Sequence, residues 1–369
     1  MKEVTVSLHQ RTVGPRVPKD FSDFINPDTW RPYAEHFRTA QSLLRSELQV
    51  NAAQEREIRA KLRVKLENEL KSNVFALNAE QIKAAQQILQ SNVCAIDGTL
   101  AKVDLLSGIR SQIGVVACTY ANFQQTYVAY VTEATYANYN SADDVLDVLK
   151  DRKREKRAIS DLVLRATMAY WERRRALEQS SAWKIVHGEL FPFELRSGLG
   201  ELKALPITLG LFKEIAEAKN IGSVVSDSTG IERFLGYALK RNEYMIIGTL
   251  FRDYKIWLDS EAHFSASDAA LFKEFNEEYC KDFLKCVYRV GPRPFLFYCH
   301  REKLHEFAAI LIADSNLVPE RGFPILIDYA DSICASLFRA GDFERRVAHE
   351  LALQGELLAE QSERANRAR

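Results

Sequence analysis

The stretch at residues 93–100, Val-Cys-Ala-Ile-Asp-Gly-Thr-Leu, constrains the fold more than any other part of the chain. Its apolar run has the length of a buried central strand, and it ends in Asp97 and Gly98. Such a strand delivers one carboxylate to a polar edge, where a glycine lets a substrate or ion approach the backbone. Taken alone, the pattern also fits an ordinary strand-to-turn Asp-Gly. The positions of later acidic residues decide between these interpretations.

The size and charge of the chain limit the kinds of protein that it can be. With 369 residues it exceeds the usual size of one domain, so we expect one large domain with an extension, or two domains. Hydrophobic residues make up 47% and charged residues 27%, which excludes a chain disordered throughout. The 50 basic and 50 acidic residues cancel. This balance excludes a uniformly basic nucleic-acid coat but not a nuclease that contacts DNA through local patches.

The cysteines and the apolar runs indicate the compartment. The six cysteines lie in apolar segments without C-x-x-C spacing, so they indicate neither a zinc site nor a redox pair. We interpret them as reduced core residues of a cytoplasmic protein. No apolar run approaches the length of a membrane span, and residues 1–16 lack the apolar segment of a signal peptide. The sequence therefore predicts no membrane association.

The pattern before the Asp97 strand is helical. Residues 30–72 contain no glycine and intersperse charges with leucines, which predicts a long amphipathic helix or a helical hairpin. Asn78, with Gln81 three residues on, fits a capping box and opens a helix to residue 90. We therefore expect residues 1–90 to form a lead-in and a helical arm.

The pattern after this strand alternates strands and helices, which predicts a mixed α/β domain. A polar helical tail is expected at residues 346–369. The expected elements are a hairpin at residues 113–120 and 125–132, a helix at 141–180, a strand at 183–190, a helix at 209–218 capped by Thr208, strands at 221–226 and 244–250 around a helix at 230–240, a hairpin at 283–290 and 295–300, and helices at 304–314, 325–338 and 342–369.

Four acidic residues lie on these elements or at their ends: Asp97, Glu172, Glu189 and Asp331. Their order is the layout of an RNase H-like nuclease, in which a mixed sheet flanked by helices gathers carboxylates around two divalent ions. Phosphodiester hydrolysis uses one ion to activate a water and another to stabilise the leaving oxygen, and hard Mg²⁺ or Mn²⁺ prefers carboxylate ligands. The sequence therefore predicts these four residues as catalytic metal ligands.

The chain resembles the NurA family of nucleases over about residues 91–345. The family has a D-G-S motif after a first strand, a helical Glu, a second D-G-S-L-like motif and a late G-Y-P…A-H segment. The similar segments here are Asp97-Gly98-Thr99, Glu172, His187-Gly188-Glu189-Leu190, and Gly322-Phe323-Pro324 through Ala330-Asp331.

This resemblance implies a function and partners. It implies an RNase H-like nuclease domain at residues 91–345 and a DNase that depends on Mn²⁺ or Mg²⁺, with two ions per site. The expected substrates are single strands and duplex ends, in DNA-end processing or anti-phage defence. It also implies a homodimer and cooperation with a HerA-type hexameric ATPase that translocates DNA.

The chain departs from the family pattern at three positions. His187 stands where the family has Asp, so the ligand is either His187, which binds Mn²⁺ but suits Mg²⁺ poorly, or Glu189. Alternate strand positions face the same side, which would let Glu189 supply the carboxylate. Phe323 replaces a Tyr, and Asp331 replaces a His. A catalytically degenerate DNA clamp or adaptor on the translocase, or an unrelated α/β scaffold, are the alternatives.

Basic residues near the predicted site fit phosphate contacts, although a charge run on a helix also fits a solvated face. The candidates are Arg152, Lys153, Arg173 and Arg174. The chain has no Gly-rich nucleotide-binding motif, so any ATP hydrolysis would come from a partner.

Overall fold

The computed structural model describes residue 25 and residues 33–69, 73–121, 124–137, 139–150, 157–199, 202–227, 232–260 and 264–356. The chain divides into two compact units, Met1–Lys71 and Ser72–Arg369. Of the lead-in that we expected before the helical pattern at residues 30–72, the structure describes only residue 25.

The described part of the first unit is mainly one helix, α1 (Tyr33–Glu69), so the alternative of a helical hairpin is wrong. Ion pairs at i,i+4 spacing line its exposed surface, including Lys61 with Glu57 at 2.6 Å and Arg63 with Glu67 at 2.6 Å. Each such pair stabilises a helix by only a few tenths of a kcal/mol. Large apolar side chains such as Leu48 and Ile58 are exposed on the same helix.

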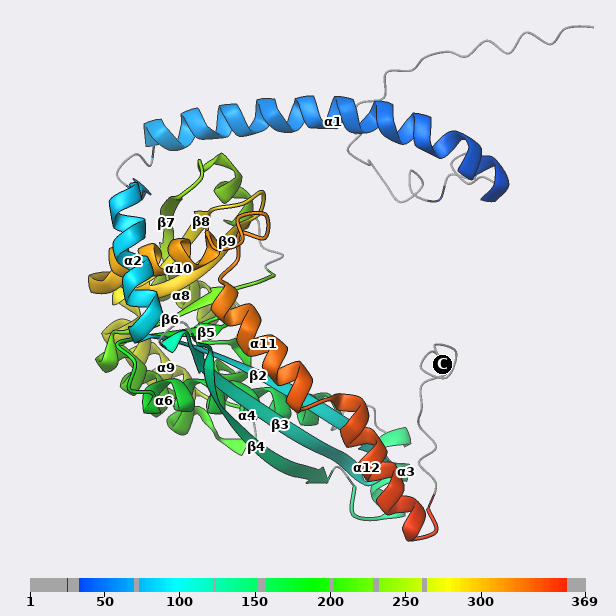
Figure 1. Ribbon diagram of the computed structural model, residues 1–369. Helices are drawn as coiled ribbons and strands as arrows, with labels where there is room; N and C mark the ends of the chain where they lie inside the picture. The colour runs from blue at the N-terminus through cyan, green and yellow to red at the C-terminus, as the bar shows by residue number, and fades with distance from the viewer. Residues whose placement is uncertain are drawn as a thin grey trace, which may run out of the picture. The chain divides into compact units, whose positions relative to one another are not determined.

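The described part of the second unit contains one mixed sheet of nine strands, in the order β1-β7-β8-β9-β6-β5-β2-β3-β4 (Figure 1). The predicted mixed α/β fold is confirmed. Only β2 with β5 and β5 with β6 pair in parallel within these residues, so the centre of the sheet has an edge where parallel strands end together. The strands are β1 (Val74–Ala76), β2 (Val93–Leu105), β3 (Gly108–Thr119), β4 (Thr126–Ala137), β5 (Trp183–His187), β6 (Ile221–Val225), β7 (Glu243–Thr249), β8 (Phe283–Arg289) and β9 (Pro294–His300).

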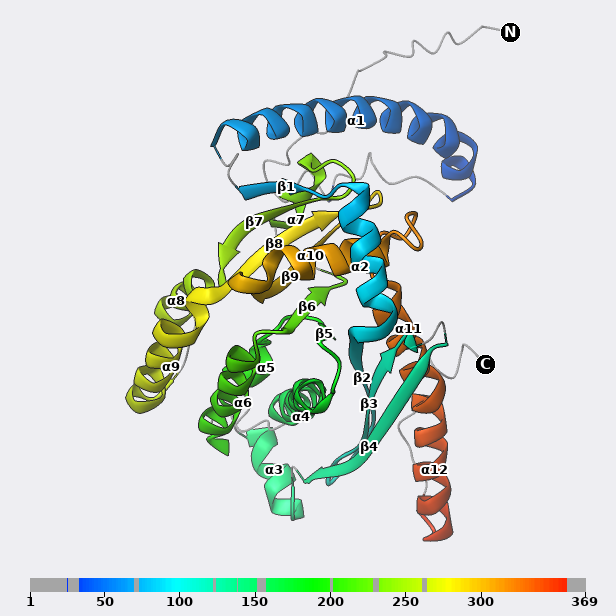
Figure 2. The same cartoon turned by 60° about the vertical axis from the view of Figure 1, so that its left-hand side comes forward.

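Helices cover both faces of the sheet. Figures 1 and 2 show α4 on one face of β2 and β3, with α11 and α12 on the other. The helices are α2 (Ala79–Asn92), α3 (Ala142–Lys150), α4 (Arg157–Glu178), α5 (Phe193–Arg196), α6 (Leu205–Ala218), α7 (Glu232–Leu235), α8 (Leu250–Ser260), α9 (Ala266–Tyr279), α10 (Leu304–Ser315), α11 (Ile325–Leu337) and α12 (Ala340–Leu353). Short 3₁₀ turns follow at Gly236–Ala238, Cys280–Asp282 and Arg301–Lys303.

Strand β2 contributes to a core on each side because successive side chains of a strand point to opposite faces. Ala95 packs with residues of α10 and α11, whereas Cys94 and Ile96 pack with residues of α4 and α6. Asp97 shares the face of Ala95, and Gly98 shares the face of Ile96. Two adjacent residues of one strand therefore meet helices from opposite sides of the sheet.

Several predicted elements are confirmed, and others differ for identifiable reasons. The capping box at Asn78 forms, and the helix that it opens runs two residues further than predicted. Strand β2 continues past the expected residue 100 and turns directly into β3. Helix α6 begins at Leu205, not after Thr208, because the Thr208 hydroxyl donates to the Leu205 carbonyl within the helix.

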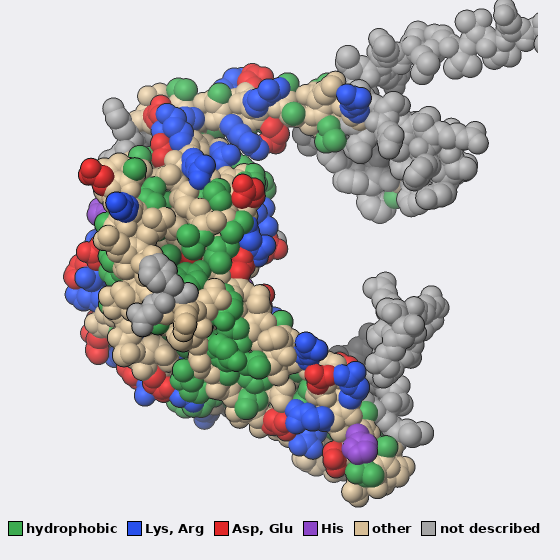
Figure 3. All heavy atoms as spheres, in the orientation of Figure 1, with side chains coloured by type: hydrophobic (Ala, Val, Ile, Leu, Met, Phe, Trp, Pro, Cys, Tyr) green, Lys and Arg blue, Asp and Glu red, His purple; other side chains and the backbone are tan. Residues whose placement is uncertain are grey.

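The burial of the cysteines and the mixture of charges on the surface agree with the amino-acid composition. All six cysteines are buried and unpaired, as predicted. In the part of the chain that the structure describes, no helix has both the length and the apolar character to cross a membrane. Over the face drawn in Figure 3, Lys and Arg side chains are interspersed with Asp and Glu side chains.

Candidate functional site

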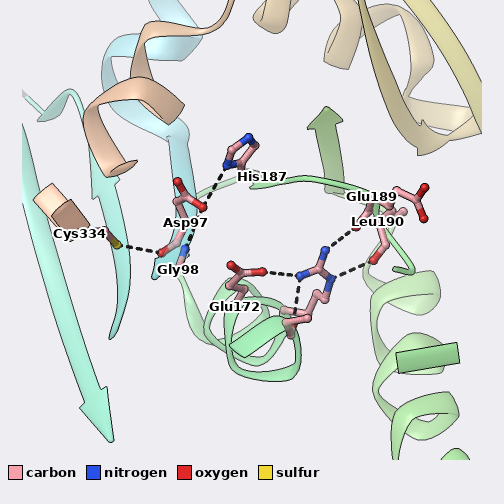
Figure 4. Close-up of polar contacts among 9 residues, drawn as sticks. Asp97, Gly98, Glu172, His187, Glu189, Leu190 and Cys334 are labelled. Carbon is pink, nitrogen blue, oxygen red and sulfur yellow. Dashed lines mark hydrogen bonds and ion pairs between the residues drawn. The ribbon is translucent and has the colours of Figure 1, made fainter. Parts of the chain in front are cut away.

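Asp97 and His187 lie side by side at the edge where parallel strands end. Ile96 pairs with Val186 in the parallel register of β2 and β5, so the next residue on each strand projects at the same level. The Asp97 carboxylate is buried, and its Oδ1 lies 3.1 Å from His187 Nδ1 (Figure 4). The Gly98 N–H donates to the same oxygen at 2.9 Å. Asp97 is therefore held in one orientation by the backbone and by the neighbouring strand.

Glu172 approaches Asp97 from α4, and Gly98 makes room for it. A Cβ on Gly98 would lie 2.5 Å from Glu172 Oε1 and 2.9 Å from Met168 Cγ. The space above this glycine, which we expected to admit a substrate or ion, is therefore filled by the Glu172 side chain. A glycine at this position lets the helix bring a carboxylate against the strand.

Arg173 is buried, which corrects the expectation that it contacts DNA. Its side chain is only 1% exposed. Its Nη1 donates to Glu172 Oε2 at 2.5 Å and to the Ala169 carbonyl at 3.0 Å. Its Nε donates to the Leu190 carbonyl at 3.0 Å, and its Nη2 donates to the Glu189 carbonyl (Figure 4). Arg173 thus joins Glu172 to the segment after β5.

Asp331 lies on α11, across the sheet from Glu172. It is exposed, and the same helix is fixed to the site strand by Cys334, whose Sγ donates to the Asp97 carbonyl at 3.4 Å. Partial desolvation raises the pKa of Asp331 even though the residue is exposed, and the charge of Asp97 raises it further. The two carboxylates are therefore within electrostatic reach of each other.

Burial and mutual repulsion also shift the other groups. Burial raises the pKa of Glu172 to about 7, with the Arg173 cation opposing that rise and the Asp97 charge adding to it. Burial lowers the pKa of His187, but its hydrogen bond to Asp97 and the nearby carboxylates outweigh this, so its pKa is raised. The cluster thus holds more negative charge than its surroundings neutralise when its carboxyl groups are ionised.

Glu189 does not join these residues. Strand β5 ends at His187, and Gly188 turns the chain with a φ of +85°, so strand alternation does not extend to Glu189. The Glu189 carboxylate accepts from Arg196 Nη1 at 3.0 Å, and Figure 4 shows it directed away from Asp97. Of the two candidates in the second motif, the structure places His187 at Asp97.

Two further residues lie at the site: Ser226 was not predicted as part of it, and Phe323 was named only as a departure from the family motif. Ser226 follows β6, and its Oγ lies 2.8 Å from His187 Nε2. Phe323 is buried, and its ring centroid lies 6.0 Å from that of His187. Ser226 ends the predicted strand at residues 221–226, so the rule that singled out Asp97, a polar residue at a strand end, would have found it.

The other predicted basic residues pair with another acidic residue or are not described. Arg174 is bonded to Glu214 on α6 through its Nη1 at 2.6 Å. Arg152 and Lys153 lie outside the described residues. Across the described ranges, no group of three or more His, Cys, Asp or Glu side chains is arranged closely enough to hold a metal ion as it stands.

Comparison with known proteins shows the fold. No family model matches the sequence, and no curated protein matches it. The structure is similar to the NurA nuclease from Sulfolobus solfataricus, with a TM-score of 0.50 and 12% sequence identity, over 84% of this chain and 97% of that chain. Two further NurA crystal structures, the second solved with manganese, have TM-scores of 0.47 and 0.40 and are each 10% identical. They match 88% and 74% of this chain, and 99% and 93% of their own.

The likeness to the Sulfolobus nuclease covers most of this chain and nearly all of the other. The predicted structural resemblance to NurA nucleases and the RNase H-like mixed fold are therefore confirmed. At this level of identity the likeness concerns the fold.

Proposed function

We propose that the chain is a divalent-metal-dependent DNA nuclease. The observation that carries this proposal is that Asp97, Glu172 and His187 come together from three separate elements at one sheet edge, with Asp331 of α11 within electrostatic reach of Asp97. The NurA-like fold and the resemblance of the motifs support it. The reaction is hydrolysis of phosphodiester bonds in single strands and at duplex ends.

The side chains at this edge carry the donor atoms of a metal site, and an ion would have to draw them closer together than they stand here. Carboxylate oxygens are the donors that Mg²⁺ and Mn²⁺ prefer, and the imidazole of His187 favours Mn²⁺ over Mg²⁺. The pKa values of Glu172 and Asp331 are raised by burial and by the charge of Asp97, and a bound cation would relieve this repulsion. We assign Asp97, Glu172 and Asp331 as ligands of two ions, with His187 as a ligand or phosphate contact.

The ions, when bound, supply Lewis acidity that activates a water and stabilises the leaving oxygen. The protein's own residues hold the carboxylates in position. The Gly98 N–H and His187 orient Asp97, and Arg173 orients Glu172. The buried Phe323 ring packs edge-on near His187, with ring centroids 6.0 Å apart.

Partners and context are further parts of the proposal. The resemblance of the motifs supports a homodimer that works with a HerA-type hexameric ATPase in DNA-end processing or anti-phage defence. The free, buried thiols support a cytoplasmic location. Light scattering on the purified chain should give the mass of a dimer, and a monomer would contradict that part.

A DNA clamp without catalytic activity is the second candidate. It is favoured by His187 in place of a carboxylate and by the Arg173 contact that already occupies Glu172. Calorimetry with Mn²⁺ distinguishes the two, because a degenerate site binds the ion weakly or not at all. A nuclease at an Mn²⁺ concentration one hundred times Kd should gain about 2.7 kcal/mol of unfolding free energy.

The direct test is a DNase assay with Mn²⁺ on Asp97→Ala. Activity should fall by at least about 100-fold, the upper end of what loss of an outer-shell partner costs a metal site. Asp104→Ala is the matched control, because Asp104 lies on the same strand and is also partly buried. Full activity in Asp97→Ala would sink the proposal.

A further inference from the structure

We propose that Arg233 and Arg293 bind a backbone phosphate of the DNA strand that enters the carboxylate cluster. This inference rests on the proposed nuclease function and assigns its DNA-contacting residues. We call these two residues, which share Asp227, the arginine pair. Arg233 lies on α7, and Arg293 lies in the turn between β8 and β9.

The arginine pair is directly connected to the site. Ser226 Oγ lies 2.8 Å from His187 Nε2, and the next residue is Asp227. Asp227 Oδ1 accepts from Arg293 Nη2 at 2.6 Å and from Arg233 Nη1 at 3.3 Å. Consecutive Cα atoms are about 3.8 Å apart, so this carboxylate is one residue from the hydrogen-bonded network of Asp97.

A second series of contacts links Arg293 to His187 through two phenylalanine rings. Its guanidinium lies 5.5 Å from the Phe295 ring, and Phe295 packs on Phe323 with ring centroids 4.9 Å apart. Phe323 in turn packs on His187. Gly291 in this turn packs closely against Gly322, since a Cβ on Gly291 would lie 3.2 Å from Gly322 Cα.

The charge of this group favours an anion. Two guanidinium groups share one oxygen of one carboxylate, which leaves a net positive charge. The Nε atoms of both arginines are buried without a hydrogen-bond partner among the described residues, so the protein does not fully satisfy either guanidinium. The Arg293 side chain is 41% exposed. A guanidinium presents five N–H donors in a planar fork that matches the oxygens of a phosphate.

Other cations near the site are less suited to this role. Arg173 is buried, and Arg174 pairs with Glu214. Arg321 forms a two-point pair with Asp328, with Nη2 2.6 Å from Oδ1, so that pair is neutral. Because the carboxylate cluster repels a polyanion, a positive group beside it is needed to bring a phosphate close.

The test compares Arg293→Gln with Arg301→Gln in binding to a fluorescent single-stranded DNA, with Ca²⁺ in place of Mn²⁺ to prevent cleavage. The two arginines flank the same strand, β9, at opposite ends, and each side chain pairs with an aspartate. Arg293→Gln should bind about fivefold more weakly near 0.1 M salt, with the slope of log K against log salt reduced by about 0.7. Arg301→Gln should bind like the wild type.

Two more variants separate charge from structure. Arg293→Lys should restore most of the salt slope, because the charge is kept and only the fork is lost. Asp227→Asn should tighten binding, because it removes the anion that competes for both guanidiniums. A merely structural role for the pair predicts no gain in affinity with Asp227→Asn.

These experiments separate failure of the phosphate site from failure of the proposed nuclease function. If the wild type cleaves DNA while Arg293→Gln and Arg301→Gln bind with equal affinity and salt slope, the arginine pair is not the phosphate site. If the wild type binds neither Mn²⁺ nor DNA, the proposed nuclease function itself fails.

Discussion

Replacing Gly98 with alanine separates the position of Glu172 from its chemistry. The variant keeps every charged group of the site and adds one methyl. Its Cβ would lie 2.5 Å from Glu172 Oε1 and 3.1 Å from Glu172 Cγ, and ordinary contacts begin at 3.4 Å. The Glu172 carboxylate must therefore move by roughly 1 Å, a misplacement that costs an active site about 100-fold in rate.

The same shift should have little effect on stability. The closest atom is the far end of a flexible side chain, the next is Met168 Cγ in another flexible side chain, and alanine in a strand is favoured over glycine by about 0.5–1 kcal/mol. We therefore expect an unfolding free energy within about 1 kcal/mol of the wild type, a value at the low end of core overpacking effects.

The assay measures Mn²⁺ affinity by calorimetry and DNA cleavage on the same preparation, with urea unfolding as the stability reference. Gly248→Ala is the matched control, because Gly248 also lies in a strand and a Cβ there meets nothing within 4 Å. Wild-type affinity and cleavage in Gly98→Ala would refute the reasoning that Glu172 acts from the position described.

Three further predictions concern the surroundings of the site. In Gly222→Ala the new Cβ would lie 2.3 Å from Phe307 Cζ, a buried ring, so urea unfolding should show a loss of about 1–3 kcal/mol, and a neutral result would contradict the packing described. Arg173→Gln leaves Glu172 buried without its cation, so the unfolding free energy should fall by about 3–5 kcal/mol, and wild-type stability would mean that the pair is not buried. Burial raises the pKa of Asp314 to about 7, and the hydrogen bonds from the Leu326 N–H and the Tyr120 hydroxyl oppose that rise. Between pH 4 and 7 the folded state therefore binds a proton that the unfolded state has released. Stability should therefore rise as pH falls from 7 towards 4, by up to about 1.4 kcal/mol per pH unit from this group, and Asp314→Asn should lose that contribution in urea titrations at several pH values.

The sequence predicted the parts of the site that depend on a strand end. Asp97 follows an apolar run of the length of a central strand, and the turn at residues 291–294 marks the β8–β9 hairpin. Each of these signals lies within a short stretch of sequence, so it can be recognised without knowledge of the tertiary structure. A local signal also existed for α9, whose cap Ser265 accepts from the Asp268 N–H, although no helix was predicted there.

The parts that were missed depend on packing or on a single dihedral angle. Glu172 and Arg173 are neighbours on one helix, and tertiary packing buries both of them in one ion pair. Glu189 was expected to continue an alternating strand, but the positive φ of Gly188 ends that alternation. The arginine pair comes from a short helix and a hairpin turn that are distant in sequence, so no short sequence motif predicts it.

The contact between Cys334 and Asp97 joins residues 237 positions apart, so the ribosome synthesises the two sides of the site at different times. A ribosome that adds about 5–20 residues per second finishes α11 more than ten seconds after β2 has emerged. Throughout that interval the nascent chain carries Asp97 without the helix that bears Asp331. On the proposed assignment, a chain cut short before α11 would lack a complete metal site, so nuclease activity would be confined to molecules whose synthesis has passed that helix.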